Sequence, residues 1–268
     1  MQVSSLHIYP IKSCGGTTLR DVRVGKYGLE GDRTFMVVNP EGRFLTQREI
    51  SRMALIAPEL SQNYLVLAAP GMEPLDVPIV EDDVRTTVQI WRHTVDAVDQ
   101  GDSAGEWLSR FLDQPVRLVG TSPDFKRPLN PDYAPRPTDE TAFADGYPVL
   151  LISRASLDDL NMRLTGRGQE PLPMNRFRPN IVVEDTDAFA EDTWKHIRIG
   201  GVEFDVVKPC PRCPIPSINQ DTGISDGKEP LATLATFRTH ELGVIFGQNL
   251  VHAGTGVLHV GDEVILGN

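Results

Sequence analysis

The chain has 268 residues, 40% of them hydrophobic and 24% charged, which allows one large globular domain or two of ordinary size. A formal net charge of −11 at pH 7 argues against nucleic acid as a partner, since a phosphate backbone is bound by excess cationic charge. Three cysteines are too few for a disulfide framework, the start lacks a signal-peptide pattern, and no stretch reaches the ~20 apolar residues of a membrane helix. We therefore expect a protein of the reducing cytoplasm.

The first 120 residues read mostly as strands. Residues 35–38 and 43–46 flank Asn39-Pro40-Glu41-Gly42, whose proline and glycine predict a type I turn within a hairpin. Two loops, residues 10–16 and 28–33, place Lys12 and Arg33 beside flexible backbone, which is what a bound anion needs. A merely solvated cation in a polar turn is the alternative for either residue.

One helix is predicted in this half, over residues 103–113. Ser103 and Glu106 have capping-box spacing, and Trp107 and Phe111 belong to one apolar face that should pack on the sheet. Residues 121–139 then contain five prolines among polar residues, a composition typical of an extended linker or a long surface loop. The sequence thus predicts two domains, residues 1–120 and 121–268.

The second half alternates strands with short helices. An apolar strand over 149–152 precedes a helix capped by Ser153 or Ser156 and stopped by Gly166. A strand over 181–183 follows the polar stretch 175–180, and Gly200-Gly201 predicts a tight hairpin between two alternating strands. A short helix should begin at Pro230, a further strand should follow residues 246–249, and residues 260–266 close the chain.

Cys210 and Cys213 lie in the stretch 202–223. The strand that opens this stretch should end near Lys208, because prolines then recur at every second position or close to it and exclude a helix interior or a central strand. Lys208 and Arg212 supply cationic charge that favours the thiolate. The sequence therefore predicts a stiff loop whose thiolate acts as a metal ligand or a nucleophile.

Three interpretations of this cysteine pair remain open. A structural zinc site needs four ligands, and only Cys14 and six scattered histidines are left to complete it. A dithiol redox pair normally opens a helix, which the prolines oppose. In the third interpretation one thiolate binds a cofactor metal and the other is its neighbour.

Several motifs occur in an order that resembles one family. YPIKS, LEGDR, NRFRPNIVV, EDTW and CPRC followed by DTG are similar to the MOSC-domain proteins, and more narrowly to the amidoxime reducing components of mitochondria and the bacterial YcbX-type enzymes. The likeness covers nearly the whole chain. It implies an α+β, predominantly β fold, with an N-terminal β-barrel-like segment followed by a MOSC β-barrel domain with a few peripheral helices.

The resemblance also implies a molybdenum cofactor, with the metal ligated by Cys213. Cys210 and Cys14 are then structural neighbours. Cofactor contacts carry over to Lys12, Ser13, Arg33, Asp145, Gly146, Tyr147, Arg178, Asn180, Pro211, Arg212 and Asn249.

The implied activity is reduction of N-hydroxylated compounds, such as amidoximes and hydroxylamines, by oxygen-atom removal at the Cys-ligated molybdenum. The bacterial relatives carry a cysteine-rich iron–sulfur domain that is not found in this sequence. We therefore expect a separate electron-transfer protein, such as a ferredoxin, a flavodoxin or a cytochrome b5-like haem protein, with its reductase. The alternative is a molybdenum cofactor carrier or sulfur-handling module without reductase turnover.

Overall fold

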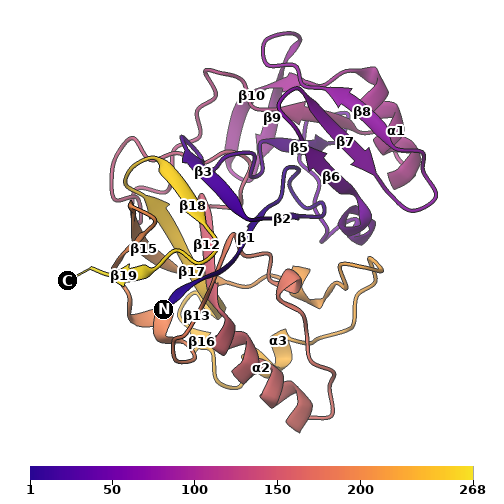
Figure 1. Ribbon diagram of the computed structural model, residues 1–268. Helices are drawn as coiled ribbons and strands as arrows, with labels where there is room; N and C mark the ends of the chain where they lie inside the picture. Colours follow the sequence, from indigo (N-terminus) through magenta and orange to yellow (C-terminus); the bar gives the residue numbers. More distant parts are fainter. Residues whose placement is uncertain (268) are drawn as a thin grey trace.

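Strands dominate the computed structural model, which describes residues 1–267 (Figure 1). This confirms the predominantly β fold class. The strands of the first half are β1 (Gln2–Ile8), β2 (Thr17–Leu19), β3 (Asp21–Gly25), β4 (Gly28–Leu29), β5 (Phe35–Val38), β6 (Ala57–Leu60), β7 (Tyr64–Ala68), β8 (Leu75–Pro78), β9 (Arg85–Ile90), β10 (His93–Asp99) and β11 (Arg117–Gly120). Those of the second half are β12 (Val149–Ser153), β13 (Ile181–Glu184), β14 (His196–Ile199), β15 (Val202–Pro211), β16 (Thr239–His240), β17 (Gly243–His252), β18 (Gly256–His259) and β19 (Val264–Leu266).

The largest sheet joins the start of the chain to its second half. Its strand order is β19-β14-β15-β17-β12-β13-β1-β2, with β16 paired to β17. β1 runs antiparallel to β13, with Leu6 opposite Ile181, and β12 runs parallel to β13. Because β1 completes this sheet, the loop that follows it, residues 9–16, is anchored at the edge of the second half. The predicted division at residues 121–139 stays a prediction.

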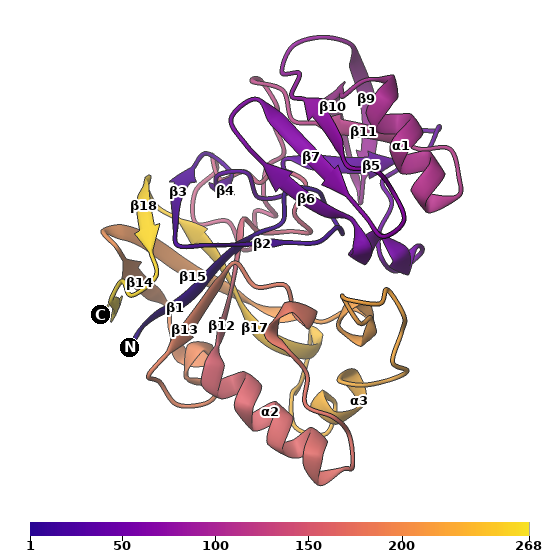
Figure 2. The same ribbon diagram turned by 45° about the vertical axis from the view of Figure 1, so that its right-hand side comes forward.

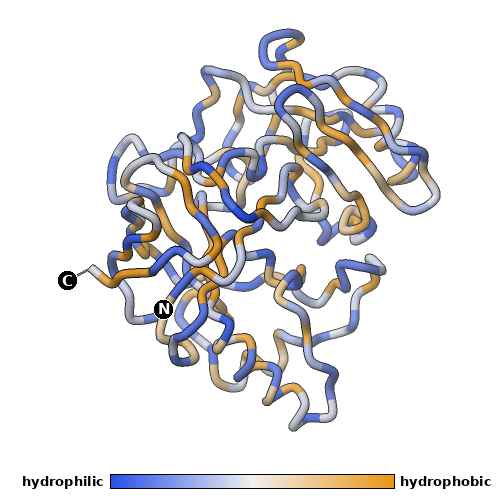
Figure 3. The backbone as a smooth tube through the Cα atoms, in the orientation of Figure 1, coloured by the Kyte–Doolittle hydropathy of each residue, from blue (hydrophilic) through white to orange (hydrophobic). Residues whose placement is uncertain are grey.

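Smaller sheets form the rest of the first half. One has the order β5-β11-β10-β9, a second is β6-β7-β8, and α1 (Asp102–Leu112) packs against strands of both. A third, β18-β3-β4, brings a late strand back to the first half. Figure 2 shows these sheets above the large one, and Figure 3 shows apolar residues concentrated along the strands.

Helix ends confirm one local prediction and overturn another. In α2 (Arg154–Gly166) the Ser153 hydroxyl accepts a bond from the Ser156 amide, as its position predicts. The capping box predicted for Ser103 and Glu106 is wrong: α1 begins at Asp102 after Gly101 and has no side-chain cap. α3 (Leu231–Leu234) follows Pro230 as expected, and no helix within residues 1–267 is long and apolar enough to cross a membrane.

Two strands near the cysteines are longer than predicted. β15 continues to Pro211, past Lys208, and β17 begins at Gly243, so residues 246–249 lie inside a strand. The prolines are tolerated because β14 pairs only with the first part of β15, leaving one edge free, and because the register shifts between Pro209 and Pro211. The Gly200-Gly201 hairpin is confirmed, with both glycines at positive φ and Ile199 opposite Val202.

Candidate functional site

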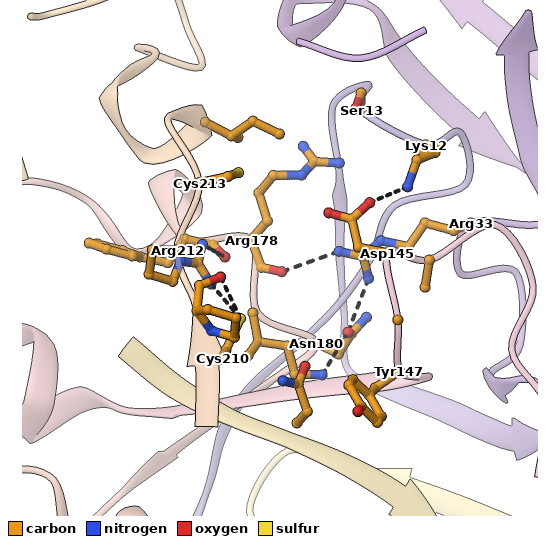
Figure 4. A pocket seen from close by; sticks show the side chains of 17 residues that line it. Lys12, Ser13, Arg33, Asp145, Tyr147, Arg178, Asn180, Cys210, Arg212 and Cys213 are labelled. Atoms are coloured by element: carbon orange, nitrogen blue, oxygen red, sulfur yellow. Dashed lines mark hydrogen bonds and ion pairs between the residues drawn. The ribbon is translucent and has the colours of Figure 1, made fainter. Parts of the chain in front are cut away.

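All the residues predicted for a site line one pocket between the large sheet and loops of the first half (Figure 4). Lys12, Ser13, Arg33 and residues 144–147 form one side, and residues 210–213 at the end of β15 form the other. The pocket is lined by Lys12, Ser13, Arg33, Ala144, Asp145, Gly146, Tyr147, Leu150, Phe177, Arg178, Asn180, Cys210, Pro211, Arg212, Cys213, Ile215 and Asn249. Sequence reasoning did not name Ala144, Leu150, Phe177 or Ile215 for the site.

Backbone hydrogen bonds tie the first-half loops together. The Lys12 amide donates to the Phe35 carbonyl at 2.8 Å, and the Arg33 amide donates to the Tyr9 carbonyl at 2.8 Å. The Gln47 side chain donates to the Ser13 carbonyl at 2.8 Å. Each cation is thus presented by a loop whose polar backbone is satisfied, which a buried loop requires.

Three residues of the pocket adopt left-handed backbone conformations. Ser13, Arg33 and Arg178 have φ values of 65°, 48° and 56°. For a non-glycine residue such a conformation costs about 1–2 kcal/mol, and it persists where surrounding contacts hold it. Strained backbone at three positions around one cavity makes this cavity the candidate functional site.

Arg33 is held by a carboxylate and an amide. Its Nη1 donates to Asp32 Oδ2 at 2.6 Å and to Asn180 Oδ1 at 3.0 Å. Burial acts to lower the pKa of Arg33, but the Asp32 carboxylate outweighs it and the pKa is raised. Asn180 Oδ1 also accepts from the Leu150 amide at 3.1 Å, and the Asn180 amide donates to the His7 carbonyl at 3.1 Å, so this side chain ties Arg33 to β12 and β1.

Arg178 lacks such a partner. It is buried, makes no ion pair among residues 1–267, and its Nη2 has no hydrogen-bond partner there. Its guanidinium carbon lies 4.1 Å from the centroid of the Tyr9 ring. Burial, together with the nearby Arg33 charge, lowers the pKa of Arg178 to about 10. This uncompensated charge makes the pocket favourable for an anion.

Lys12 is also buried, and its charge is partly compensated. Its ammonium donates to the Phe143 carbonyl at 2.9 Å and pairs with the Asp145 carboxylate. The Asp145 side chain is 56% exposed, and its Oδ2 also lies 3.5 Å from Arg48 Nη2. Burial lowers the pKa of Lys12 to about 8, with Asp145 opposing that shift. Burial acts to raise the pKa of Asp145, but the adjacent cations, Lys12 first, hold it well below its usual range.

Three residues that support the pocket were not predicted from the sequence. Arg127, in the proline-rich stretch, donates to the carbonyls of Ala142 and Ala144 at 2.6 Å and of Asp145 at 2.9 Å. Tyr9 faces both Arg33 and Arg178, and Asp32 pairs with Arg33. Tyr9 and Asp32 fall within the YPIKS and LEGDR motifs, so these motifs could have identified them. Arg127 lies in no such motif, and nothing in its local sequence indicates a role in the pocket.

Arg212 links the end of β15 to the Phe177–Arg178 segment. Its Nη2 donates to the Phe177 carbonyl at 2.8 Å, and its Nη1 lies 3.3 Å from Cys210 Sγ. Asn249 donates to the Lys208 carbonyl at 3.3 Å and so supports the strand before the thiols. Cys14 is fully buried outside this loop, and burial raises the pKa of its thiol to about 12.

The pocket combines a thiol with an excess of cations. Lys12, Arg33, Arg178 and Arg212 line it, whereas Asp145 is the one carboxylate lining residue among those the structure describes. A cysteine thiolate suits a soft metal, and buried cations with unpaired N–H groups suit an anionic carrier. Within residues 1–267 no three histidine, cysteine, aspartate or glutamate side chains cluster as a metal site. A metal carried by an anionic organic group fits these residues.

Comparison with known proteins matches two regions of the chain. Residues 1–115 match the family described as the MOSC N-terminal beta barrel domain, and residues 138–265 match the MOSC domain. Mitochondrial amidoxime-reducing component 1 of Danio rerio is 38% identical over 98% of this chain and 83% of its own length. Component 2 of Rattus norvegicus is 38% identical, and component 1 of Homo sapiens 35% identical, each over 98% of this chain and 82% of its own length.

Proposed function

Because the chain belongs to the MOSC-domain family that includes the amidoxime-reducing components, we propose that it is a molybdenum-cofactor-dependent reductase of N-hydroxylated compounds. The substrates would be amidoximes and hydroxylamines, which lose the oxygen of the N–OH group. One observation carries the proposal: Cys213 shares a pocket with cations whose charges the protein does not fully compensate.

The residues of the pocket divide into two groups by what they would hold. Cys213 would supply the protein's thiolate to the metal. Lys12, Ser13 and Arg33 would hold the phosphate of the cofactor, with Arg178 beside them. Charge-assisted hydrogen bonds from such donors to a phosphate are the strong kind.

Other predicted residues would act through their neighbours. Asn180 orients Arg33, Asn249 braces β15, and Arg212 fixes the distance between the cysteine loop and the Phe177–Arg178 segment. Pro211 stiffens the backbone beside Arg212, since its ring restricts φ. Asp145, Gly146 and Tyr147 would form the wall against the organic part of the cofactor. Outer contacts of this kind tune a metal site nearly as strongly as its ligands.

When bound, the cofactor would supply the two-electron redox chemistry that removes oxygen from nitrogen. The chain supplies position and electrostatics. Burial of Lys12 and Arg178 keeps their charges poorly solvated, so each interacts with a bound anion more strongly than an exposed cation would. Partial exposure of Cys213 leaves its side of the pocket open for a small substrate.

We propose further that electrons come from a separate protein, a ferredoxin, flavodoxin or cytochrome b5-like haem protein with its reductase. The relatives are named as components, which supports a system of several proteins. Location in the cytoplasm stays a prediction, and the relatives' names contain the word mitochondrial.

The test is turnover of benzamidoxime by the cofactor-loaded protein with an artificial electron donor. We expect conversion to benzamidine by the wild type and none by Cys213→Ser. The variant should keep its fold, because Cys213 makes no hydrogen bond to other described residues, and should retain some pterin through the cations. Circular dichroism measures the fold, pterin fluorescence measures the retained pterin, and elemental analysis measures the bound molybdenum.

Cys210→Ser is the matched control, since it removes the other thiol of the loop. We expect it to keep molybdenum and to remain active. A Cys213→Ser protein that reduces benzamidoxime at the wild-type rate would disprove the assignment of the ligand. A loaded wild type that holds molybdenum but reduces no N-hydroxylated compound would instead be a cofactor carrier.

A further inference from the structure

A second pocket adjoins the first and has no assigned role. The two share Asp145, Gly146 and Tyr147, so the same loop forms a wall of both. The remaining lining comes from residues 91–93 at the β9–β10 turn, from the proline-rich stretch, from Thr141 and from Lys208 on β15. A molecule that extends across this loop would contact both pockets.

Cationic side chains accumulate in this second pocket. Arg92, Arg127 and Lys208 line it, and none of them makes an ion pair within the part of the chain that the structure describes. The pKa of His93 is lowered by burial and by the charges of Arg127 and Arg92. Asp145, the carboxylate on the shared wall, is already paired with Lys12 and Arg48. In a chain with a net charge of −11, such an unmatched group of cations favours an anionic ligand.

Two buried polar groups strengthen this interpretation. Arg127 is 3% exposed, and its guanidinium donates to three carbonyls. Within residues 1–267 its Nε has no hydrogen-bond partner and no carboxylate forms an ion pair with it, although burial lowers its pKa to about 10 against the opposing charge of Asp145. Thr141 is fully buried, and its hydroxyl also lacks a hydrogen-bond partner among the described residues. Both residues line the second pocket. Buried polar groups are ordinarily satisfied, so unpaired donors beside a cavity point to a ligand within it.

Aromatic side chains complete the walls. Trp91 lines the pocket from the β9–β10 turn, with a left-handed φ of 53° and 37% exposure, and Tyr147 lines it from the shared loop. The Lys208 ammonium lies 4.1 Å from the centroid of the Tyr133 ring and 6.0 Å from that of Tyr147. Aromatic walls beside cations suit a planar ring that carries an anionic group.

We propose that the second pocket binds the carboxylate or phosphate group of an aromatic substrate whose N–OH group lies in the first pocket. This rests on the proposed reductase function and narrows its substrate class to N-hydroxylated ring compounds with an anionic substituent. Arg92 and Lys208 bind the anion. Tyr147, whose loop lines both pockets, contacts the cofactor on one side and the substrate ring on the other.

The experiment compares two substrates on the cofactor-loaded protein, benzamidoxime and 4-carboxybenzamidoxime. We expect the wild type to show a kcat/KM at least ~10-fold higher for the carboxylate, through a lower KM, as charged hydrogen bonds of this kind typically provide. In Arg92→Gln and Lys208→Gln the ratio of the two kcat/KM values should fall toward one. Arg154→Gln, the matched control, removes an exposed charge at the start of α2 and should keep the wild-type ratio.

Three results would overturn the proposal. A wild-type ratio near one would show that the anion is not recognised. A ratio that stays high in both Arg92→Gln and Lys208→Gln would place the recognition elsewhere. A ratio that falls equally in Arg154→Gln would show an effect of net charge alone.

A binding measurement separates this proposal from the reductase function. Calorimetry with 4-carboxybenzamidine, which has no N–OH group to reduce, can be carried out even if neither oxime turns over. We expect the wild type to bind it, and both pocket variants to bind it about tenfold more weakly. If turnover fails while this pattern holds, the reductase function fails and the anion site stands. Equal affinity in the wild type and both pocket variants would refute the anion site.

Discussion

The guanidinium carbon of Arg178 lies 4.1 Å from the centroid of the Tyr9 ring. The Arg33 guanidinium carbon lies 4.5 Å from the same centroid. A cation over an aromatic face gains about 0.5–2 kcal/mol, so the ring helps to hold two like charges in one pocket. The Tyr9 hydroxyl donates to the Pro179 carbonyl at 3.1 Å, which fixes the ring against the residue that follows Arg178.

Two replacements of Tyr9 should separate the role of its ring face from the role of its hydroxyl. Tyr9→Leu removes the aromatic face, and we expect cofactor content to fall about tenfold as Arg33 and Arg178 lose their common support. Tyr9→Phe keeps the face and loses the hydrogen bond, so it should keep the cofactor and lose about 1 kcal/mol of unfolding free energy. Pterin fluorescence and urea unfolding measure the two effects. Equal cofactor loss in both variants would contradict a role for the ring face.

Anion binding should depend on the protonation of Lys12. Burial lowers its pKa to about 8, so in the cofactor-free protein this side chain loses its charge as pH rises through that value. We expect sulfate, whose own charge is constant over this range, to bind more weakly at pH 9 than at pH 7. Lys12→Gln should bind sulfate weakly at both values. Calorimetric titration of the two proteins tests this, and a wild-type affinity unchanged from pH 7 to pH 9 would exclude the effect.

Arg178 and Arg176 should respond oppositely to neutralisation. Arg178→Gln removes a buried charge that has no carboxylate partner within residues 1–267, so we expect the cofactor-free variant to gain about 1 kcal/mol of unfolding free energy. The same variant should retain less cofactor when it is loaded. Arg176 is also buried, but it pairs with Asp226 at 2.8 Å and donates to the Pro216 carbonyl at 2.8 Å. Arg176→Gln should therefore lose about 1–2 kcal/mol. Urea unfolding of both proteins would show this, and a shift of the same sign in both would refute it.

Arg127 should control the order of the loop shared by the two pockets. Removing its three bonds to the carbonyls of Ala142, Ala144 and Asp145 in Arg127→Gln should increase amide exchange over residues 142–147 and reduce cofactor content. Arg127→Lys keeps the charge but has fewer donors, so it should restore part of the amide protection and part of the cofactor content. Hydrogen–deuterium exchange of the cofactor-free protein provides the readout, and unchanged exchange in Arg127→Gln would rule out this role.

Much of the local structure could be predicted from the residues. The Gly200-Gly201 hairpin and the Ser153 cap formed as expected, because turn and cap geometry depend on residues within a few positions of one another. The capping box at Ser103 did not form, since the helix begins one residue earlier, at Asp102. β15 extends beyond Lys208 because β17 pairs with it. The prolines alone do not reveal this pairing, since β17 lies more than 30 residues further along the chain.

The sequence could single out Lys12 and Arg33 from the polar loops that carry them, and Arg178 and Cys213 through the family motifs that contain them. Folding settled how their charges are compensated: Asp145 pairs with Lys12 from 133 positions away, whereas Arg178 is buried without a carboxylate. Burial and electrostatic compensation depend on contacts between distant segments. Burial and compensation are therefore decided only in the folded chain, where β1 pairs within the sheet of the second half and the loop that follows β1 lies near the cysteines.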